Sequence, residues 1–347
     1  MSTTEQPGKG RTKTRQVTAE LLRNQRRRAS RSRVSGRMAP TAMDELPGST
    51  AAHRPGLAPR WLAGGLGLLA VVVALAMVAG RSNEPSVPAG LEPVALVSLV
   101  HGPATVSTPG DGTSHPLEVG MSLDPGDVIV TSTSADGQVG QVALELDQGS
   151  SLRIDRDSQV QLMPSSPSSL YLERGAVYLD VAESDSAMEV RTLFGVVRDI
   201  GTQFEVRILD GESSSLRVRV REGAVELERP DGIRHRADAG EELISKADGT
   251  LERHGVASYG PQWEWVLATA AVPDLEGLPR EVFCQWYARQ GGWQLVYADP
   301  DVEEAAKALM RDNGDDLTAH EAASLVFQGT GLGLRVVEGE LRLEALD

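Results

Sequence analysis

Short runs of alternating apolar and polar residues dominate the chain between residues 94 and 255. Phe204–Ile208 and Leu216–Val220 are examples. Glycine-containing pairs such as Asp136-Gly137 and Glu222-Gly223 separate the runs, and glycine readily adopts the positive φ that a tight turn requires. Short strands at this spacing are typical of all-β folds. The pattern predicts a mainly β domain over residues 94–255, built as a sandwich or as a solenoid-like stack.

The segment 256–347 has a different pattern, and we predict that it forms a small α/β domain. Its apolar residues recur at helical spacing after Pro279, which can open a helix, and Thr318 with Glu321 forms a capping-box motif. The predicted elements are a helix from Pro279 to Gly291-Gly292, a strand at Trp293–Tyr297, helices at Val302–Met310 and Ala319–Gln328, and a hairpin of Leu332–Val337 with Leu341–Leu346.

Residues 61–80 read WLAGGLGLLAVVVALAMVAG and contain no charged side chain. A helix of this length is about 30 Å long, which matches the hydrocarbon core of a bilayer. Arg60 and Arg81 flank the run. We therefore expect one transmembrane helix at 61–80, followed by a linker at 81–93. A cleaved signal peptide is the alternative, although such a peptide has a shorter apolar run and a shorter leading segment.

Charge is distributed unevenly on the two sides of this run. Residues 1–60 contain 13 Lys and Arg against 4 Asp and Glu, whereas the rest of the chain contains 21 against 45. Because positively charged flanks remain in the cytoplasm, we expect a cytoplasmic N-terminus and periplasmic C-terminal domains, with the chain anchored once in a bacterial inner membrane.

The tail at 1–60 is basic and its composition predicts that most of it is disordered. A short helix at Val17–Arg28 is the exception that we expect. Arg26, Arg27 and Arg28 at its C-terminal end are candidate partner-binding residues. They could contact anionic lipid or dock an acidic cytoplasmic protein. Nucleic acid is the least favoured partner, because no aromatic residue or recognition helix accompanies the arginines.

Several ordered motifs in the predicted β domain resemble the FecR family. They are LELDQGSSLRIDRDSQVQL at 144–162, YLERGAVYLDVAE at 171–183, RTLFGVVRDIGTQFEVR at 191–207, LRVRVREGAVE at 216–226 and AGEEL at 239–243. We interpret the motif residues as structural. Gly195, Gly201 and Gly223 meet tight backbone requirements, Asp199 and Thr202 satisfy turn backbone, and Ile200, Phe204, Val206, Val218 and Val220 alternate into a core.

The C-terminal segment resembles the short N-terminal domain of secretins and of signalling TonB-dependent receptors. EVFCQWYARQGGWQLVYADPDV and LTAHEAASLVFQGTGLGLRVVEGELRLE carry this resemblance. It implies that the domain adds strands to a partner or packs against one, for example a receptor domain of the outer membrane. The candidate contact residues are Trp293, Tyr297, Arg335 and Arg342, together with an edge strand at Leu341–Leu346.

The sequence contains no motif for catalysis or for a cofactor. The six histidines show no metal-ligand spacing, and the single cysteine, Cys284, lies in an apolar helical pattern that is typical of a core residue. We therefore expect a protein that is not an enzyme and that binds no cofactor.

The FecR resemblance implies a single-pass signal transducer that relays an envelope signal to a cytoplasmic regulator, such as a sigma factor of the extracytoplasmic class. The tail lacks the tryptophan-containing helical unit that is usual in sigma-regulating members. A membrane-anchored envelope scaffold, whose β domain binds protein or glycan, is therefore the alternative.

Overall fold

The computed structural model describes residues 93–346, apart from residues 111, 147–148, 165, 167, 183–186, 212–213 and 311–316. The predicted basic tail with Arg26, Arg27 and Arg28, the predicted membrane helix at 61–80 and nearly all of the linker lie outside the described residues. Within the described residues, no helix is long and apolar enough to cross a membrane.

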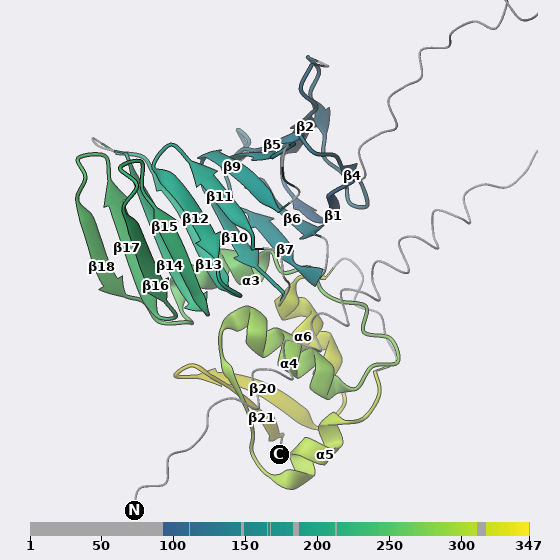
Figure 1. Cartoon of the computed structure of the whole chain (residues 1–347). Helices are drawn as coiled ribbons and strands as arrows, with labels where there is room; N and C mark the ends of the chain where they lie inside the picture. Colours follow the sequence, from purple (N-terminus) through teal and green to yellow (C-terminus); the bar gives the residue numbers. More distant parts are fainter. Residues whose placement is uncertain are drawn as a thin grey trace, which may run out of the picture. The chain divides into compact units, whose positions relative to one another are not determined.

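Two large sheets form the β-domain, which we define as residues 93–255 (Figure 1). Sheet A contains β1 (Ala95–His101), β4 (Ser122–Leu123), β6 (Gln141–Leu146), β7 (Ser151–Ile154), β10 (Ala176–Asp180), β13 (Gln203–Leu209), β14 (Ser215–Glu222), β17 (Glu241–Lys246) and β18 (Leu251–Gly255). Its strands lie in the order β18-β17-β14-β13-β10-β7-β6-β1-β4.

Sheet B contains β2 (Ala104–Ser107), β3 (His115–Pro116), β5 (Val128–Thr131), β8 (Gln159–Leu162), β9 (Ser169–Arg174), β11 (Glu189–Thr192), β12 (Gly195–Asp199), β15 (Ala224–Glu228) and β16 (Arg234–Asp238). Its order is β16-β15-β12-β11-β9-β8-β5-β2-β3. Neighbouring strands are antiparallel except for β9 and β11, which are parallel.

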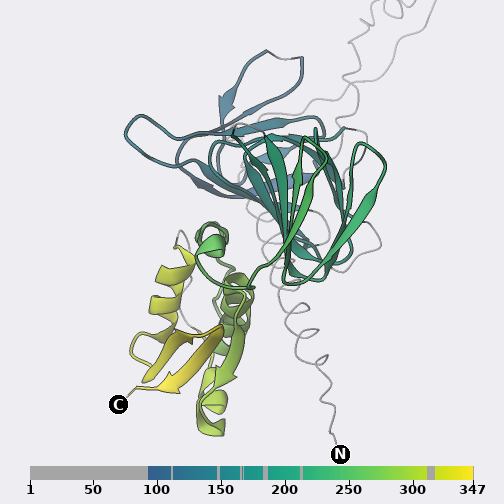
Figure 2. The ribbon, with the colours of Figure 1, turned by 90° about the vertical axis from the view of Figure 1, so that its left-hand side faces the viewer.

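The chain alternates between the two sheets while it advances along both of them. The strands β6 and β7 lie in sheet A, β8 and β9 in sheet B, and β10 in sheet A again. Figure 2 shows the sheets as separate layers. Aliphatic side chains and Phe204 fill the space between them, including Leu152, Leu172, Val197 and Val218. Each such side chain contributes roughly 1.5–3 kcal/mol by leaving water. The predicted β-rich fold is confirmed, with features of both a sandwich and a solenoid.

Gly175 and Gly223 mark two corners at which the chain changes sheets. Gly175 lies between β9 in sheet B and β10 in sheet A, and Gly223 lies between β14 in sheet A and β15 in sheet B. Their φ angles are +83° and +78°. A Cβ atom on Gly223 would lie 2.3 Å from the carbonyl oxygen of Gly201. Only glycine combines this conformation with this close approach.

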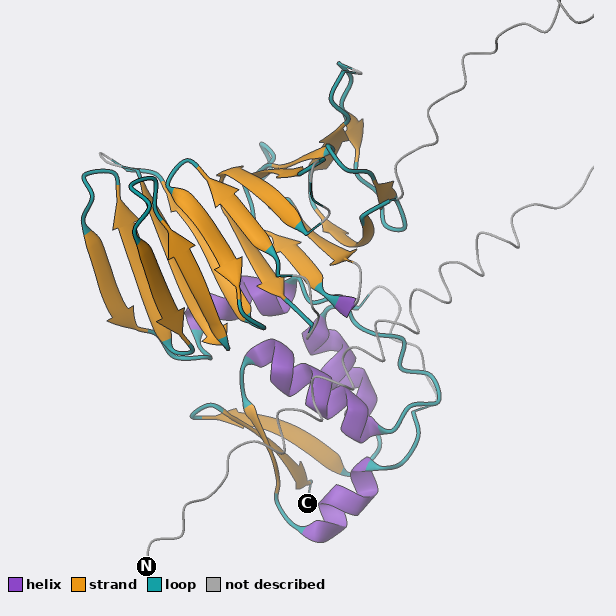
Figure 3. Cartoon of the chain, viewed as in Figure 1, coloured by secondary structure: helices purple, strands orange, loops and turns teal. Residues whose placement is uncertain are grey.

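The C-terminal domain, which we define as residues 256–346, contains most of the helices of the described residues (Figure 3). Its elements are η2 (Pro261–Trp263), α3 (Glu264–Ala268), α4 (Arg280–Gly291), β19 (Gln294–Tyr297), α5 (Pro300–Ala306), α6 (Ala319–Phe327), β20 (Leu332–Val337) and β21 (Glu340–Ala345). Phe283, Cys284 and Leu343 belong to its core, as predicted for Cys284.

The local signals at the helix ends are confirmed. Thr318 and Glu321 form the predicted capping box at α6. Gly292 adopts the left-handed conformation at the end of α4, with φ of 70°. The predicted hairpin is present as β20 and β21. The predicted helix at Val302–Met310 is shifted, since α5 spans Pro300–Ala306.

Two predictions about individual positions are wrong. Ile200 is not a core residue, because it follows β12 in a turn and is 51% exposed. Leu341–Leu346 is not an edge strand. The order of the small sheet is β19-β21-β20, so β21 is its central strand and both Leu341 and Leu343 are buried. The parallel pairing with β19, which covers the second side of β21, leaves no trace in the local pattern.

Candidate functional site

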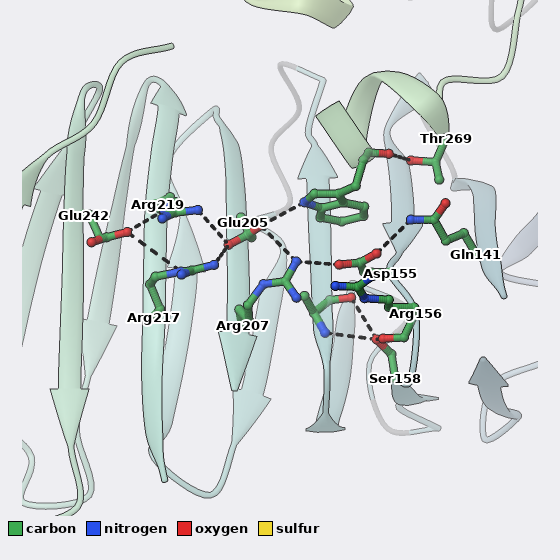
Figure 4. A network of polar contacts seen from close by, with 12 residues as sticks. Gln141, Asp155, Arg156, Ser158, Glu205, Arg207, Arg217, Arg219, Glu242 and Thr269 are labelled. Atoms are coloured by element: carbon green, nitrogen blue, oxygen red, sulfur yellow. Dashed lines mark hydrogen bonds and ion pairs between the residues drawn. The ribbon is translucent and has the colours of Figure 1, made fainter. Parts of the chain in front are cut away.

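The outer face of sheet A carries a network of arginines and carboxylates (Figure 4). Side chains alternate along its strands, so Phe204 and Val206 point into the core while Glu205 and Arg207 point outward. The same alternation places Arg217 and Arg219 outward on β14, between core residues of the repeating sequence LRVRV.

Glu205 is the centre of this network and is fully buried. It accepts hydrogen bonds from Arg217 Nη2 at 3.0 Å, from Arg207 Nη2 at 3.4 Å and from Trp265 Nε1 of α3 at 3.0 Å. Arg219 Nε donates to Glu242 on β17 at 2.5 Å. Several charged donors thus replace the water that Glu205 loses on burial, which is the condition for burying a carboxylate.

Arg207 links Glu205 to a second buried carboxylate, Asp155. Its Nη2 atom donates to Asp155 Oδ2 at 2.5 Å, and Gln141 donates to the other oxygen of Asp155 at 2.8 Å. Burial by itself lowers the pKa of Arg207, but the charges of Glu205 and Asp155 outweigh burial and raise that pKa above its ordinary value. Arg207 therefore stays charged.

A second group of buried charges joins the β-domain to the C-terminal domain. Arg289 on α4 contacts Asp180 on β10 at 2.5 Å and Glu222 on β14 at 2.8 Å. Arg221 on β14 donates to the carbonyl of Ser258 at 2.6 Å and to that of Gln290 at 2.9 Å.

Arg153 on β7 completes the junction. It donates to the carbonyl of Val266 at 2.5 Å and to the side chain of Gln290. The six residues Arg153, Tyr178, Asp180, Arg221, Glu222 and Arg289 from the two domains define what we call the domain junction.

Aromatic side chains fill the space between these charges. Tyr178 on β10 is buried against Trp263, with ring centroids 6.0 Å apart in an edge-to-face arrangement. The guanidinium of Arg221 lies 4.9 Å from the Trp263 ring centroid and that of Arg153 lies 5.4 Å from the Tyr178 centroid. These are cation–π distances, so the arginines are compensated by ring faces as well as by carboxylates.

Burial shifts the pKa values at the junction in opposite directions. Burial lowers the pKa of Arg153 to about 10. Burial alone raises the pKa of Asp180, but the charge and hydrogen bonds of Arg289 outweigh it and hold that pKa below its ordinary value. At neutral pH both groups are charged, and the junction is an ionic contact.

A cavity of about 360 Å³ lies beside the Glu205 network. The outer face of sheet A forms one wall, with Asp155, Glu205, Arg207, Arg217 and Arg219. The other wall comes from η2 and α3, and Arg156 at the end of β7 also lines the cavity. Among the described residues, no group of three or more His, Cys, Asp or Glu could hold a metal ion.

The structure separates the predicted partner-binding residues into two kinds. Trp293 and Tyr297 are half-buried and pack against the core of the C-terminal domain. Trp293 meets Tyr287 edge-to-face, with centroids 5.3 Å apart. Arg335 and Arg342 are exposed and face each other across β20 and β21. Of these four residues, the two arginines are therefore the more exposed, and they form ion pairs with Glu344 and Glu340.

Four of the predicted motif residues, Asp199, Gly201, Thr202 and Phe204, lie between the end of β12 and the start of β13. Asp199 is buried and accepts a hydrogen bond from the Thr202 hydroxyl. Burial raises the pKa of Asp199, although hydrogen bonds to Thr202 and to the backbone of Gly201 oppose the shift. Phe204 is fully buried. Gly195, with φ of 137°, passes close to the carbonyl of Glu228.

The sequence analysis missed the buried charges. The alternation of LRVRVRE at 216–222 places three arginines on one face of a strand, which was the available signal. A polar face is ordinarily read as solvated, and the covering residues Trp263, Trp265 and Arg289 lie some 40 or more positions later in the chain.

Part of the β-domain matches a known protein family. Residues 127–226 match the FecR protein family. Two crystal structures of a candidate anti-sigma factor from Parabacteroides distasonis ATCC 8503, at 1.65 and 2.50 Å resolution, are similar at 17% and 18% identity. Each comparison covers 60% of this chain and 95% of the other, with a TM-score of 0.32. No curated protein matches the chain.

Proposed function

We propose that this chain is a single-pass regulator of the FecR type in a bacterial inner membrane, which relays an envelope signal to a cytoplasmic sigma factor. The FecR domain at residues 127–226 is the observation that carries the proposal. The apolar run at 61–80 supplies the anchor, and the charge asymmetry around it supplies the orientation.

The domain junction supports a signalling role for the C-terminal domain. Arg153 and Arg221 on sheet A contact backbone carbonyls of residues 258, 266 and 290. A partner bound to the C-terminal domain would therefore act on groups that are hydrogen-bonded to the FecR domain. The resemblance to the short domain of secretins and TonB-dependent receptors favours an envelope protein as this partner.

The test is capture of partners from membranes, with the full chain and with a bait lacking residues 1–55, read by mass spectrometry. We expect a sigma factor with the full chain alone. A charge-matched pair of variants sharpens the test. Replacement of Arg26, Arg27 and Arg28 by Gln should abolish capture, whereas replacement of Arg11, Lys13 and Arg15 by Gln removes the same charge and should leave capture intact.

An envelope scaffold remains the second candidate, because the tail lacks aromatic residues before Trp61. Under that alternative, both baits recover the same envelope proteins and neither recovers a cytoplasmic protein. That result would reject the sigma-factor role and leave the tail as an anchor.

A further inference from the structure

The cavity beside Glu205 has the size and composition of a ligand site. Its volume of about 360 Å³ falls in the range of small-molecule pockets, which is roughly 300–1,000 Å³. Four arginines line it, Arg156, Arg207, Arg217 and Arg219, against the three carboxylates of Asp155, Glu205 and Glu264. With Glu242, which contacts Arg217 and Arg219, the charges of this group balance, whereas residues 61–347 as a whole are strongly acidic.

Hydrogen-bond donors outnumber acceptors in this cavity. Each guanidinium has five N–H donors. Both hydrogen bonds that Arg207 donates to Asp155 and Glu205 come from its Nη2 atom, and its Nη1 atom has no hydrogen bond to another described residue. The exposed side chain of Arg156 likewise has no hydrogen bond or ion pair with another described residue. Donors that point into a cavity without protein acceptors are available to a ligand.

The two buried carboxylates of the cavity, in contrast, are already occupied. Both oxygens of Asp155 accept hydrogen bonds, from Gln141 and Arg207. Both oxygens of Glu205 do so as well, from Arg217 on one side and from Arg207 and Trp265 on the other. A ligand that offered mainly donors would find Glu264 on the α3 wall but neither buried carboxylate free, whereas one rich in acceptors would complete the network of the arginines.

The buried carboxylates also hold the arginines in place. Arg207 is held between Asp155 and Glu205, and its guanidinium lies 5.7 Å from the ring centroid of Trp265. Arg217 and Arg219 both contact Glu205 and Glu242. A ligand that binds to side chains ordered in advance avoids most of the entropy cost of fixing them.

We propose that this cavity binds a small anion that carries a carboxylate or a phosphate group. The arginines of sheet A and of the β7–β8 turn bind its oxygens, and η2 and α3 form the opposite wall. The site goes beyond the proposed regulatory function and is independent of whether the chain regulates a sigma factor. An occupant would contact both the β-domain and the C-terminal domain.

The test is titration of the full chain in detergent with malonate and with inorganic phosphate, at constant ionic strength maintained with sodium chloride. We expect saturable binding by calorimetry and a rise in the unfolding midpoint, because a ligand that binds the folded state stabilises it. Saturation by malonate alone assigns a carboxylate ligand, and saturation by phosphate alone assigns a phosphate ligand. Absence of saturable binding for both anions overturns the proposal and leaves a water-filled cavity.

A pair of exposed arginines supplies matched variants. Arg156→Gln should weaken the affinity by about tenfold, the effect of one charge-assisted hydrogen bond. Arg236→Gln removes another exposed arginine, on β16, and should leave the affinity unchanged. Since Arg156 has no described partner, its replacement does not threaten folding. Equal weakening by both variants would mean general attraction of anions and would also overturn the proposal.

Discussion

The two faces of sheet A are both buried, but by different means. The inner face presents Leu152, Leu179, Phe204 and Val206 to an aliphatic core. The outer face of the same strands presents Arg153, Tyr178, Glu205 and Arg207, of which the first three are less than 5% exposed. One face excludes water with apolar side chains, and the other excludes it with paired charges and aromatic rings.

This difference shows what each face can do. Apolar burial stabilises a fold without directional requirements. Buried charges contribute little net stability, because desolvation offsets their attraction, but each depends strongly on its partner. The inner face therefore holds the β-domain together, whereas the outer face gives it specific contacts with residues 258–290. Because each charge depends on a specific partner, a ligand or a binding protein could change the contacts of the outer face.

The first prediction concerns the inner face. Phe204→Ala should lower the free energy of unfolding by about 3–5 kcal/mol, because it leaves a cavity in a closely packed core. Chemical denaturation followed by tryptophan fluorescence measures the loss. Ile200→Ala is the matched control, since this nearby side chain is 51% exposed and its loss should have little effect. Equal effects of the two substitutions would contradict the assignment of Phe204 to the core and Ile200 to the surface.

The second prediction removes the ion pairs of one arginine at the outer face of sheet A. Arg289→Met should cost about 3–5 kcal/mol, because it removes the cation that contacts the buried Asp180 and the partly buried Glu222. The triple variant Asp180→Asn, Glu222→Gln, Arg289→Met removes the charges together and should recover most of this loss. Phe204→Ala has no equivalent rescue, because its cost comes from a cavity and not from charges that lose their partner. A triple variant less stable than Arg289→Met would refute the view that the junction charges mainly compensate one another.

The pH dependence of the junction follows from Asp180. Because its pKa in the folded protein is below the ordinary value of 3.8, ionised Asp180 stabilises the folded state. This contribution is complete above the pKa of the unfolded chain and is lost as the pH falls through the folded pKa. The stability difference between the wild type and Asp180→Asn should therefore be constant from neutral pH down to about 4 and shrink below it. Denaturation at a series of pH values measures this difference.

Local sequence signals predicted the helices and strands of this fold well, but they predicted poorly which distant segments pack against each element. Alternation predicted the strands with Phe204 and Val206, and the capping box predicted α6, because both signals act within a few residues. Neither the central place of β21 nor the exposure of Ile200 is encoded locally, because each depends on which distant segment packs alongside.

The site depends even more on distant residues. Arg153, Arg221 and Arg289 have the sequence pattern of solvated residues, and only the packing of α3 and α4 on sheet A makes them buried partners. Trp293 and Tyr297 were candidates because the C-terminal segment resembles a domain that packs against partners, but the core of their own domain takes up much of their surface. The sequence pattern alone does not show whether a charged or aromatic residue is buried within the protein or exposed to solvent and partners.

The fourth prediction has the smallest effect on stability and concerns charges that remain exposed. Arg335 and Arg342 lie opposite each other on β20 and β21, and Arg342 contacts Glu340 at 2.7 Å. Exposed ion pairs contribute only roughly 0–1 kcal/mol, so Arg335→Glu with Arg342→Glu should leave the unfolding midpoint nearly unchanged. If this face binds an acidic envelope partner, the double variant should lose that partner in capture from membranes, because reversal turns attraction into repulsion. Arg234→Glu with Arg236→Glu on β16 reverses two exposed charges elsewhere and should retain it. Full recovery of the partner by the Arg335 and Arg342 variant would assign binding to another surface. Loss of folding in this variant would contradict the small stability effect expected for exposed charges and would give the two arginines a structural role like that of Arg289.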